Sequence, residues 1–161
     1  MRFQSLAVLL SALLVLSACA EQSGPTLAVP ENPAKAAFLD KGYRQLTGAE
    51  IRELVSGNTV EGRYNFDTGT FVDFYAPDGR ITSLLNLRNG EELYQGRWSI
   101  DGERLCFVFP ENDSSAPLCI EQLEKDGHIV DFRTEGVTFG KYYYSETLSF
   151  TPGNVKNLPL E

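Results

Sequence analysis

The stretch TVEGRYNFDTGTFVDFYAPDGRITSLLNLRNGEELYQGRWSIDGERLCFVF, residues 59–109, decides the fold class. It is rich in β-branched and aromatic residues, which favour strands. Glycines that follow Asp or Asn interrupt it at short intervals, and such pairs favour the tight turns of β-hairpins. These turn signals are Pro77-Asp78-Gly79, Asn89-Gly90 and Asp101-Gly102. The stretch therefore predicts consecutive antiparallel strands at 59–66, 70–76, 80–87, 92–100 and 104–109.

The same pattern continues towards the C-terminus, with a further turn signal at Asp126-Gly127. It predicts three more strands at 118–124, 128–134 and 141–150. Spacing near ten residues and short connections indicate an antiparallel meander. Because helical crossovers are missing from the pattern, a parallel sheet is excluded. We therefore predict a mainly β fold, a single meander of about eight strands that forms either a small barrel or a sandwich.

One short helix is predicted ahead of the strands. Thr47 and Glu50 have the spacing of a capping box, in which each residue satisfies a backbone donor of the other. Ile51 and Val55 fall on one helical face. The pattern predicts a helix over 48–56, which we expect to cover one end of the β-domain.

The N-terminus has the organisation of a secretory signal. Arg2 precedes an uncharged apolar run at 6–16, which is too short for the roughly 20 residues of a membrane-spanning helix. The run ends in Leu16-Ser17-Ala18-Cys19, an aliphatic residue and two small residues before a cysteine. This segment resembles the lipobox of bacterial lipoproteins at all four positions. The resemblance implies that the Cys19 thiol receives a lipid, that acyl chains such as palmitate follow, and that cleavage makes Cys19 the first mature residue.

The lipoprotein resemblance also implies a location. Ala20 follows the cysteine where Asp would favour retention at the inner membrane, so the expected site is the inner leaflet of the outer membrane, facing the periplasm. Three prolines among small and polar residues predict a flexible tether over 19–37. The predicted organisation is thus a signal peptide at 1–18, a lipidated tether at 19–37 and a β-domain at 38–161. An ordinary secreted protein, or a buried structural Cys19, remains the alternative.

The other two cysteines, Cys106 and Cys119, lie on consecutive predicted strands joined by a polar loop. An exported domain meets an oxidising compartment, which favours a disulfide between them. The sequence has no C-x-x-C motif, and its one histidine has no companion ligand nearby. A reduced buried pair and a redox-active pair are the alternatives.

Motifs for catalysis or cofactor binding are missing from the sequence. It contains no G-x-S-x-G, H-E-x-x-H, P-loop or Rossmann glycine pattern. His128 follows a turn and is interpreted as a solvent-facing strand residue. Asp67, Asp73 and Asp78 do not have the spacing of a calcium-binding EF-hand, and Asp67 and Asp78 are interpreted as turn residues. We therefore predict no enzyme activity, no catalytic residue, no cofactor and no metal.

The charge balance is acidic. The chain has 14 Lys and Arg against 22 Asp and Glu, a net charge of −8 that becomes −9 without residues 1–18, whose one charge is Arg2. Such a surface repels phosphate backbones, so nucleic acid is excluded as a partner. The expected partners are the membrane, through the lipid anchor, and an envelope protein or other envelope component. The oligomeric state stays open.

The function expected from these features is that of a lipid-anchored envelope lipoprotein with a non-catalytic binding or structural β-domain. The aromatic residues either pack the core or line a cavity, since barrels of about eight strands can hold a small ligand. The alternatives are a lipocalin-like carrier of a small apolar ligand, an inhibitor of a cationic envelope-attacking enzyme such as lysozyme, and a hydrolase. A cavity inside a barrel would favour the carrier, and two carboxylates in a cleft would favour the hydrolase.

A second resemblance covers most of residues 46–120. The order of Ser56-Gly57-Asn58-Thr59, Pro77-Asp78-Gly79, Gly96-Arg97-Trp98 and Leu105-Cys106 before Cys119 is similar to that in a set of small exported alphaproteobacterial proteins of unknown function. The resemblance implies the all-β fold and supports the cysteine pairing. It implies no activity, so no functional residue is carried over from it.

Overall fold

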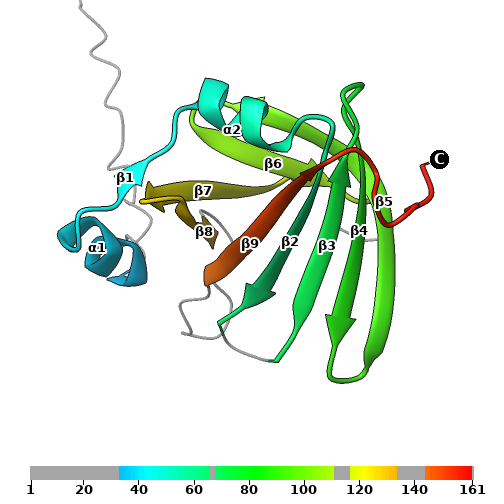
Figure 1. Cartoon of the computed structure of the whole chain (residues 1–161), viewed down its shortest axis with the longest axis horizontal. Coiled ribbons are helices and arrows are strands. Elements are labelled where there is room, and N and C mark those ends of the chain that lie inside the picture. Colours follow the sequence, from blue (N-terminus) through cyan, green and yellow to red (C-terminus); the bar gives the residue numbers. More distant parts are fainter. Residues whose placement is uncertain (1–32, 66–67, 111–116, 134–143, 161) are drawn as a thin grey trace, which may run out of the picture.

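The computed structural model describes residues 33–65, 68–110, 117–133 and 144–160, and these form nine strands and two helices (Figure 1). Both the signal peptide predicted at 1–18 and Cys19 lie outside the described residues. Neither of the two described helices is long and apolar enough to cross a membrane.

Eight strands form a closed antiparallel barrel. Each strand from β2 to β9 pairs with the next along the chain, and β9 also pairs with β2. Closure leaves these strands without a free edge on which another chain could add a strand. All eight predicted strands are confirmed, and the choice between barrel and sandwich is settled as a barrel. The strands are β2 Asn58–Tyr64, β3 Thr70–Tyr75, β4 Arg80–Leu87, β5 Gly90–Asp101, β6 Arg104–Val108, β7 Leu118–Lys125, β8 His128–Arg133 and β9 Tyr144–Pro152.

The predicted turns fall where the chain reverses. Between β7 and β8, Asp126 and Gly127 both have positive φ, of 52° and 80°. Two successive residues of this kind match the right-handed twist of a two-residue hairpin. Between β3 and β4, Gly79 has a φ of 87°, which a side chain would disfavour.

Helix α2 (Gly48–Val55) confirms the predicted helix and ends one residue earlier than expected. The Thr47 backbone N–H donates to Glu50 Oε2 at 2.8 Å, and the Glu50 N–H donates to Thr47 Oγ1 at 3.3 Å. Ile51 and Val55 are buried in the main core cluster together with Trp98. The helix lies over one end of the barrel, as expected (Figure 1).

The prediction of a single helix and of a tether reaching residue 37 is wrong. Helix α1 (Pro33–Asp40) begins inside the predicted tether. Phe38 packs against the outer face of the barrel, with its ring centroid 5.6 Å from that of Phe132 and 5.3 Å from that of Tyr144. This helix has little amphipathic pattern of its own, so tertiary contacts rather than sequence periodicity stabilise it.

Two short segments add to the outside of the barrel. Strand β1 (Arg44–Gln45) pairs with the later part of β7. After β9, the chain runs over the outer face of β2–β4, where Leu158 is buried with Phe74 and Ala76. The Thr59 hydroxyl fixes the start of this segment by donating to the Gly153 carbonyl oxygen at 2.6 Å.

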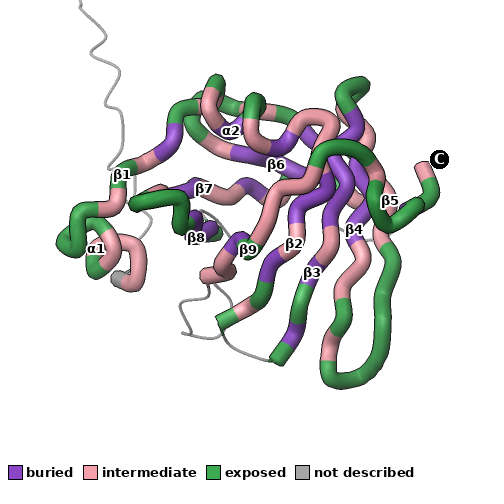
Figure 2. The backbone as a smooth tube through the Cα atoms, viewed as in Figure 1, coloured by how far each residue is buried: buried purple, intermediate pink, exposed green. Residues whose placement is uncertain are grey.

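Beneath α2 the barrel strands carry many buried residues (Figure 2), and buried apolar side chains of the main core cluster pack there against Ile51 and Val55. Trp98 is 5% exposed, and its indole N–H donates to the Ala76 carbonyl oxygen at 2.9 Å. The Arg52 guanidinium of α2 lies over the same ring, 5.5 Å from its centroid. Trp98 therefore joins the helix to the barrel and closes this end.

The predicted disulfide between Cys106 and Cys119 is confirmed. The two residues are direct partners in the register of β6 and β7, and both are buried. They alternate with Leu105 and Phe107, which belong to the core cluster inside the barrel, so the bridge lies on the outer face.

Candidate functional site

The barrel encloses a cavity of about 360 Å³. Seven of the eight barrel strands and helix α2 contribute to its wall. Most of the lining is apolar and aromatic, including Val60, Phe71, Leu85, Phe107, Leu118 and Ile120. This confirms that part of the aromatic content lines a cavity rather than filling a solid core.

Strand alternation determines which side chains face this cavity. On β3, Phe71, Asp73 and Tyr75 line it, whereas Val72 and Phe74 pack outside against the C-terminal segment. The same period of two on β8 turns Asp131 and Arg133 inward and puts Phe132 against α1. Two acidic residues thereby occupy inward positions that a barrel normally fills with apolar side chains.

The two ends of the cavity differ. Val55 of α2 lines the end that Trp98 closes. Tyr64, Leu87 and Arg133 line the opposite end, where β2, β4 and β8 finish. Because Arg133 is exposed and also lines the cavity, the cavity meets the surface at this end, which we call the mouth.

Asp131 lies in a network of donors from two neighbouring strands. Gln122 Nε2 donates to Asp131 Oδ1 at 2.6 Å, and the Ser145 and Thr147 hydroxyls each donate to Oδ2 at 3.2 Å. Complete burial raises the pKa of Asp131 to about 6, although these three hydrogen bonds lower it. The carboxyl is therefore held in place but ionises close to neutral pH.

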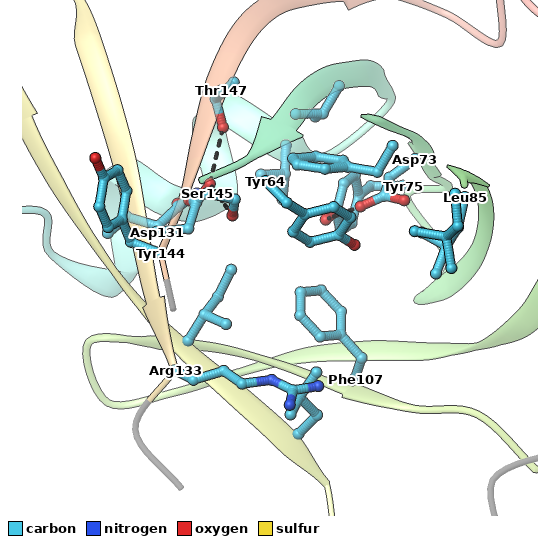
Figure 3. Close-up of a pocket in the computed structure, with 17 residues that line it drawn as sticks. Tyr64, Asp73, Tyr75, Leu85, Phe107, Asp131, Arg133, Tyr144, Ser145 and Thr147 are labelled. Atoms are coloured by element: carbon cyan, nitrogen blue, oxygen red, sulfur yellow. Dashed lines mark hydrogen bonds between the residues drawn. The ribbon is translucent and has the colours of Figure 1, made fainter. Parts of the chain in front are cut away.

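Asp73 faces the cavity from the other side, next to Tyr75 (Figure 3). The Tyr75 hydroxyl donates to Asp73 Oδ2 at 3.0 Å. Burial raises the pKa of Asp73 to about 6, the Ser83 and Tyr75 hydroxyls oppose this rise, and the negative charge of Asp131 adds to it. The two carboxyls thus interact electrostatically within one cavity.

Two buried acceptors in this cavity have no donor among the described residues. They are Asp73 Oδ1 and Gln122 Oε1, on side chains of residues that are only 8% and 2% exposed. Nearly all buried polar atoms in folded proteins have a hydrogen-bond partner, so each such atom needs an explanation. The polar part of the cavity therefore contains hydrogen-bond acceptors that lack donors among the described residues.

Among the described lining residues, the remaining titratable and charged groups are Tyr64, Tyr75, Tyr144 and Arg133. Burial is the largest cause that raises the pKa of both Tyr64 and Tyr75, and the charge of Asp73 raises them further. These two hydroxyls therefore remain protonated at neutral pH. The Arg133 guanidinium partly offsets this effect at Tyr64 and supplies positive charge at the mouth.

The acidic and histidine residues singled out in the sequence lie at different places in the structure. Asp78 is a turn residue as predicted, with its carboxylate accepting from the Arg80 backbone N–H at 3.1 Å, whereas Asp67 lies outside the described residues. His128 is exposed at the start of β8, as predicted, with Nδ1 hydrogen-bonded to the Tyr43 hydroxyl at 2.7 Å. In the described ranges, no three His, Cys, Asp or Glu side chains cluster to hold a metal ion.

Sequence reasoning missed the cavity acids. The sequence places Asp73 among three acids without EF-hand spacing, and no motif includes Asp131. A signal was present, since each acid stands at the centre of an inward-facing triplet, Phe71-x-Asp73-x-Tyr75 and Ile129-x-Asp131-x-Arg133. An acidic residue at a strand position that alternation assigns to the inner face indicates a buried carboxyl.

Comparisons of the chain with known protein families, curated proteins and solved structures identify no similar protein. No protein-family model matches the chain, and no curated protein or solved structure is significantly similar to it.

Proposed function

We propose that the protein is a lipid-anchored envelope protein whose barrel binds a small, largely apolar molecule without catalysis. The observation that carries the proposal is the cavity of about 360 Å³, lined mainly by apolar and aromatic side chains. Ligand pockets commonly have volumes of roughly 300–1,000 Å³, a mostly apolar wall and a few fixed polar groups. Eight-stranded barrels are just wide enough to hold one small ligand.

Among the functions expected from sequence, the cavity favours the carrier over a binding module with a filled core. The hydrolase alternative is supported by the two carboxylates that face one cavity. However, donors from three side chains hold Asp131, and both acids are almost completely buried. These features suit a fixed recognition group better than an acid or base that exchanges protons with water.

Ligand binding is tested by filling the cavity. Leu85→Trp adds an indole on the inner face of β4, and we expect it to weaken binding of 1-octanol at least tenfold. The matched control is Leu93→Trp, because Leu93 is 47% exposed on the neighbouring strand β5. Calorimetric titration of the purified full chain measures both affinities. Equal affinity in wild type and Leu85→Trp, or no binding to wild type, would contradict the proposal.

The anchor proposal has a separate test at Cys19. Cys19→Ala removes the thiol that the lipobox resemblance assigns to lipidation, so we expect loss of palmitate labelling and release from the membrane fraction. Ser17→Ala is the matched control, because it keeps a small residue in the box and is expected to leave labelling intact. Membrane partition of Cys19→Ala equal to that of wild type would rule out the anchor.

A further inference from the structure

The polar groups inside the barrel determine which hydrogen-bonding groups a ligand must carry. The unpartnered acceptors Asp73 Oδ1 and Gln122 Oε1 lie on β3 and β7, which are on opposite walls because three strands separate them in either direction around the barrel. An unsatisfied buried acceptor costs roughly 1–3 kcal/mol, so a ligand donor that reaches it is favoured. Donors, rather than further acceptors, are therefore what the cavity lacks.

Charge narrows the choice of donor. Asp73 and Asp131 bring two carboxyls into the cavity, whereas the one basic residue among its described lining residues, Arg133, lies at the mouth. An ammonium group has three donors, no acceptor and a positive charge. A ligand carboxylate would instead add acceptors and negative charge beside the two acids, which is unfavourable.

The surrounding wall suits an organic cation rather than a hydrated ion. The rings of Tyr64, Phe71 and Phe107 line the cavity, and Tyr64 and Phe71 lie with their ring centroids 5.4 Å apart. Aromatic faces attract cations, and an apolar wall stabilises a hydrocarbon body. The positive Arg133 at the mouth favours an orientation in which the cationic end lies deep and the apolar body follows.

We propose that the ligand is an amine with an apolar body, whose ammonium group donates to Asp73 Oδ1 in the cavity that Asp73 shares with the Asp131 carboxylate. This inference rests on the proposed function, because it names the ligand class of the same cavity. It accounts for the unpartnered Asp73 Oδ1 and for the acidic pair with a single ligand group.

The proposal makes binding pH-dependent. The pKa of both Asp73 and Asp131 is raised to about 6 by burial in the unliganded protein, so both ionise between pH 5.0 and pH 7.5. Tyr64 and Tyr75 keep their protons over this range because burial raises their pKa values. Lowering the pH to 5.0 therefore removes negative charge from the cavity, and an alkylammonium ligand, which stays protonated, loses affinity.

Three matched eight-carbon probes test the inference on the purified full chain. At pH 7.5 we expect octylamine to bind at least tenfold more tightly than 1-octanol, and octanoate to bind most weakly. Asp73→Asn is expected to abolish the preference for octylamine over 1-octanol. The control Asp78→Asn, at an exposed turn carboxyl, is expected to preserve it. At pH 5.0 the preference of wild type is expected to fall at least fivefold.

The outcomes separate this inference from the proposed function. Equal binding of octylamine and 1-octanol by wild type, or tightest binding of octanoate, would overturn the amine inference and leave the ligand-binding barrel in place. A preference for octylamine that is unchanged in Asp73→Asn and at pH 5.0 would also overturn it. If none of the three probes binds, both proposals fail. The pH series on wild type tests the inference independently of any variant.

Discussion

At pH 7.5 the Asp73→Asn variant is expected to have a free energy of unfolding about 3 kcal/mol higher than that of the wild-type chain. The physical reason is the cost of ionising a completely buried carboxyl, which raises the pKa of Asp73 from 3.8 to about 6. Asparagine has nearly the same shape and no charge, and its amide oxygen can accept the hydrogen bond that Tyr75 now gives to Oδ2.

The sign of this effect follows from proton linkage. The folded state binds the proton more tightly than the unfolded state does, so the contribution of Asp73 to stability is full below about pH 4 and is lost as the pH rises through 6. The advantage of Asp73→Asn is therefore expected to shrink to below about 1 kcal/mol at pH 4.0. Urea unfolding at pH 4.0 and pH 7.5 measures both differences.

Asp78→Asn is the matched control for this prediction. Its hydrogen bonds and ion pair with Arg80 lower the pKa of the exposed Asp78 carboxyl, the opposite direction from Asp73. We expect no gain in stability from Asp78→Asn at pH 7.5. A wild-type chain that gains stability between pH 4.0 and 7.5 relative to Asp73→Asn would contradict the account of a buried, costly carboxylate.

Removing the disulfide is expected to lower the free energy of unfolding by roughly 3 kcal/mol. Cys106 and Cys119 are 13 residues apart in sequence and bridge β6 to β7, so the bond restricts the unfolded chain over this segment. The Cys106→Ala, Cys119→Ala double variant keeps small apolar side chains at these buried positions. Urea unfolding of the double variant and of wild type, each with and without dithiothreitol, measures the loss.

The reductant supplies the control for this second prediction. Dithiothreitol is expected to destabilise wild type by a similar amount and to leave the double variant unchanged, since no disulfide remains in its barrel. Alkylation of the native, unreduced protein at both Cys106 and Cys119 would show that the bond is absent and would contradict the prediction.

The strands were predictable because their determinants are local. Asp126-Gly127 adopts the positive φ angles of a hairpin turn without help from distant residues. The capping box of Thr47 and Glu50 likewise depends on residues three positions apart. Barrel closure was not predictable, since it depends on the pairing of β2 with β9, whose residues lie more than 80 positions apart.

The parts that sequence reasoning missed depend on tertiary contacts. Phe38 stabilises α1 by packing on Phe132 and Tyr144, and a proline-rich segment gives no local sign of this. The C-terminal segment covers the sheet through Leu158 in the same way. The two cavity acids differ from these cases. The alternation of side chains along each strand indicates that Asp73 and Asp131 face inward, but only closure of the barrel brings them into one cavity.

The fold thus assigns separate tasks to the two ends of the barrel. Trp98 and α2 fill one end and fix the barrel's shape. The other end keeps a cavity whose two buried acids lower the stability of the fold near neutral pH. Sites that bind ligands often retain groups that cost stability, and two buried carboxyls with unpartnered acceptors nearby fit this pattern.

The most direct test of the central claim, that the barrel interior binds a small molecule, is methyl NMR of the full chain during titration with octylamine at pH 7.5. Binding inside the barrel predicts saturable shifts of the methyl signals of Val60, Leu85 and Ile120, which line the cavity. It predicts constant signals from Leu93 and Leu148, which are 47% and 58% exposed on the outside. Shifts confined to the two outer leucines, or no saturable shift at all, would contradict it.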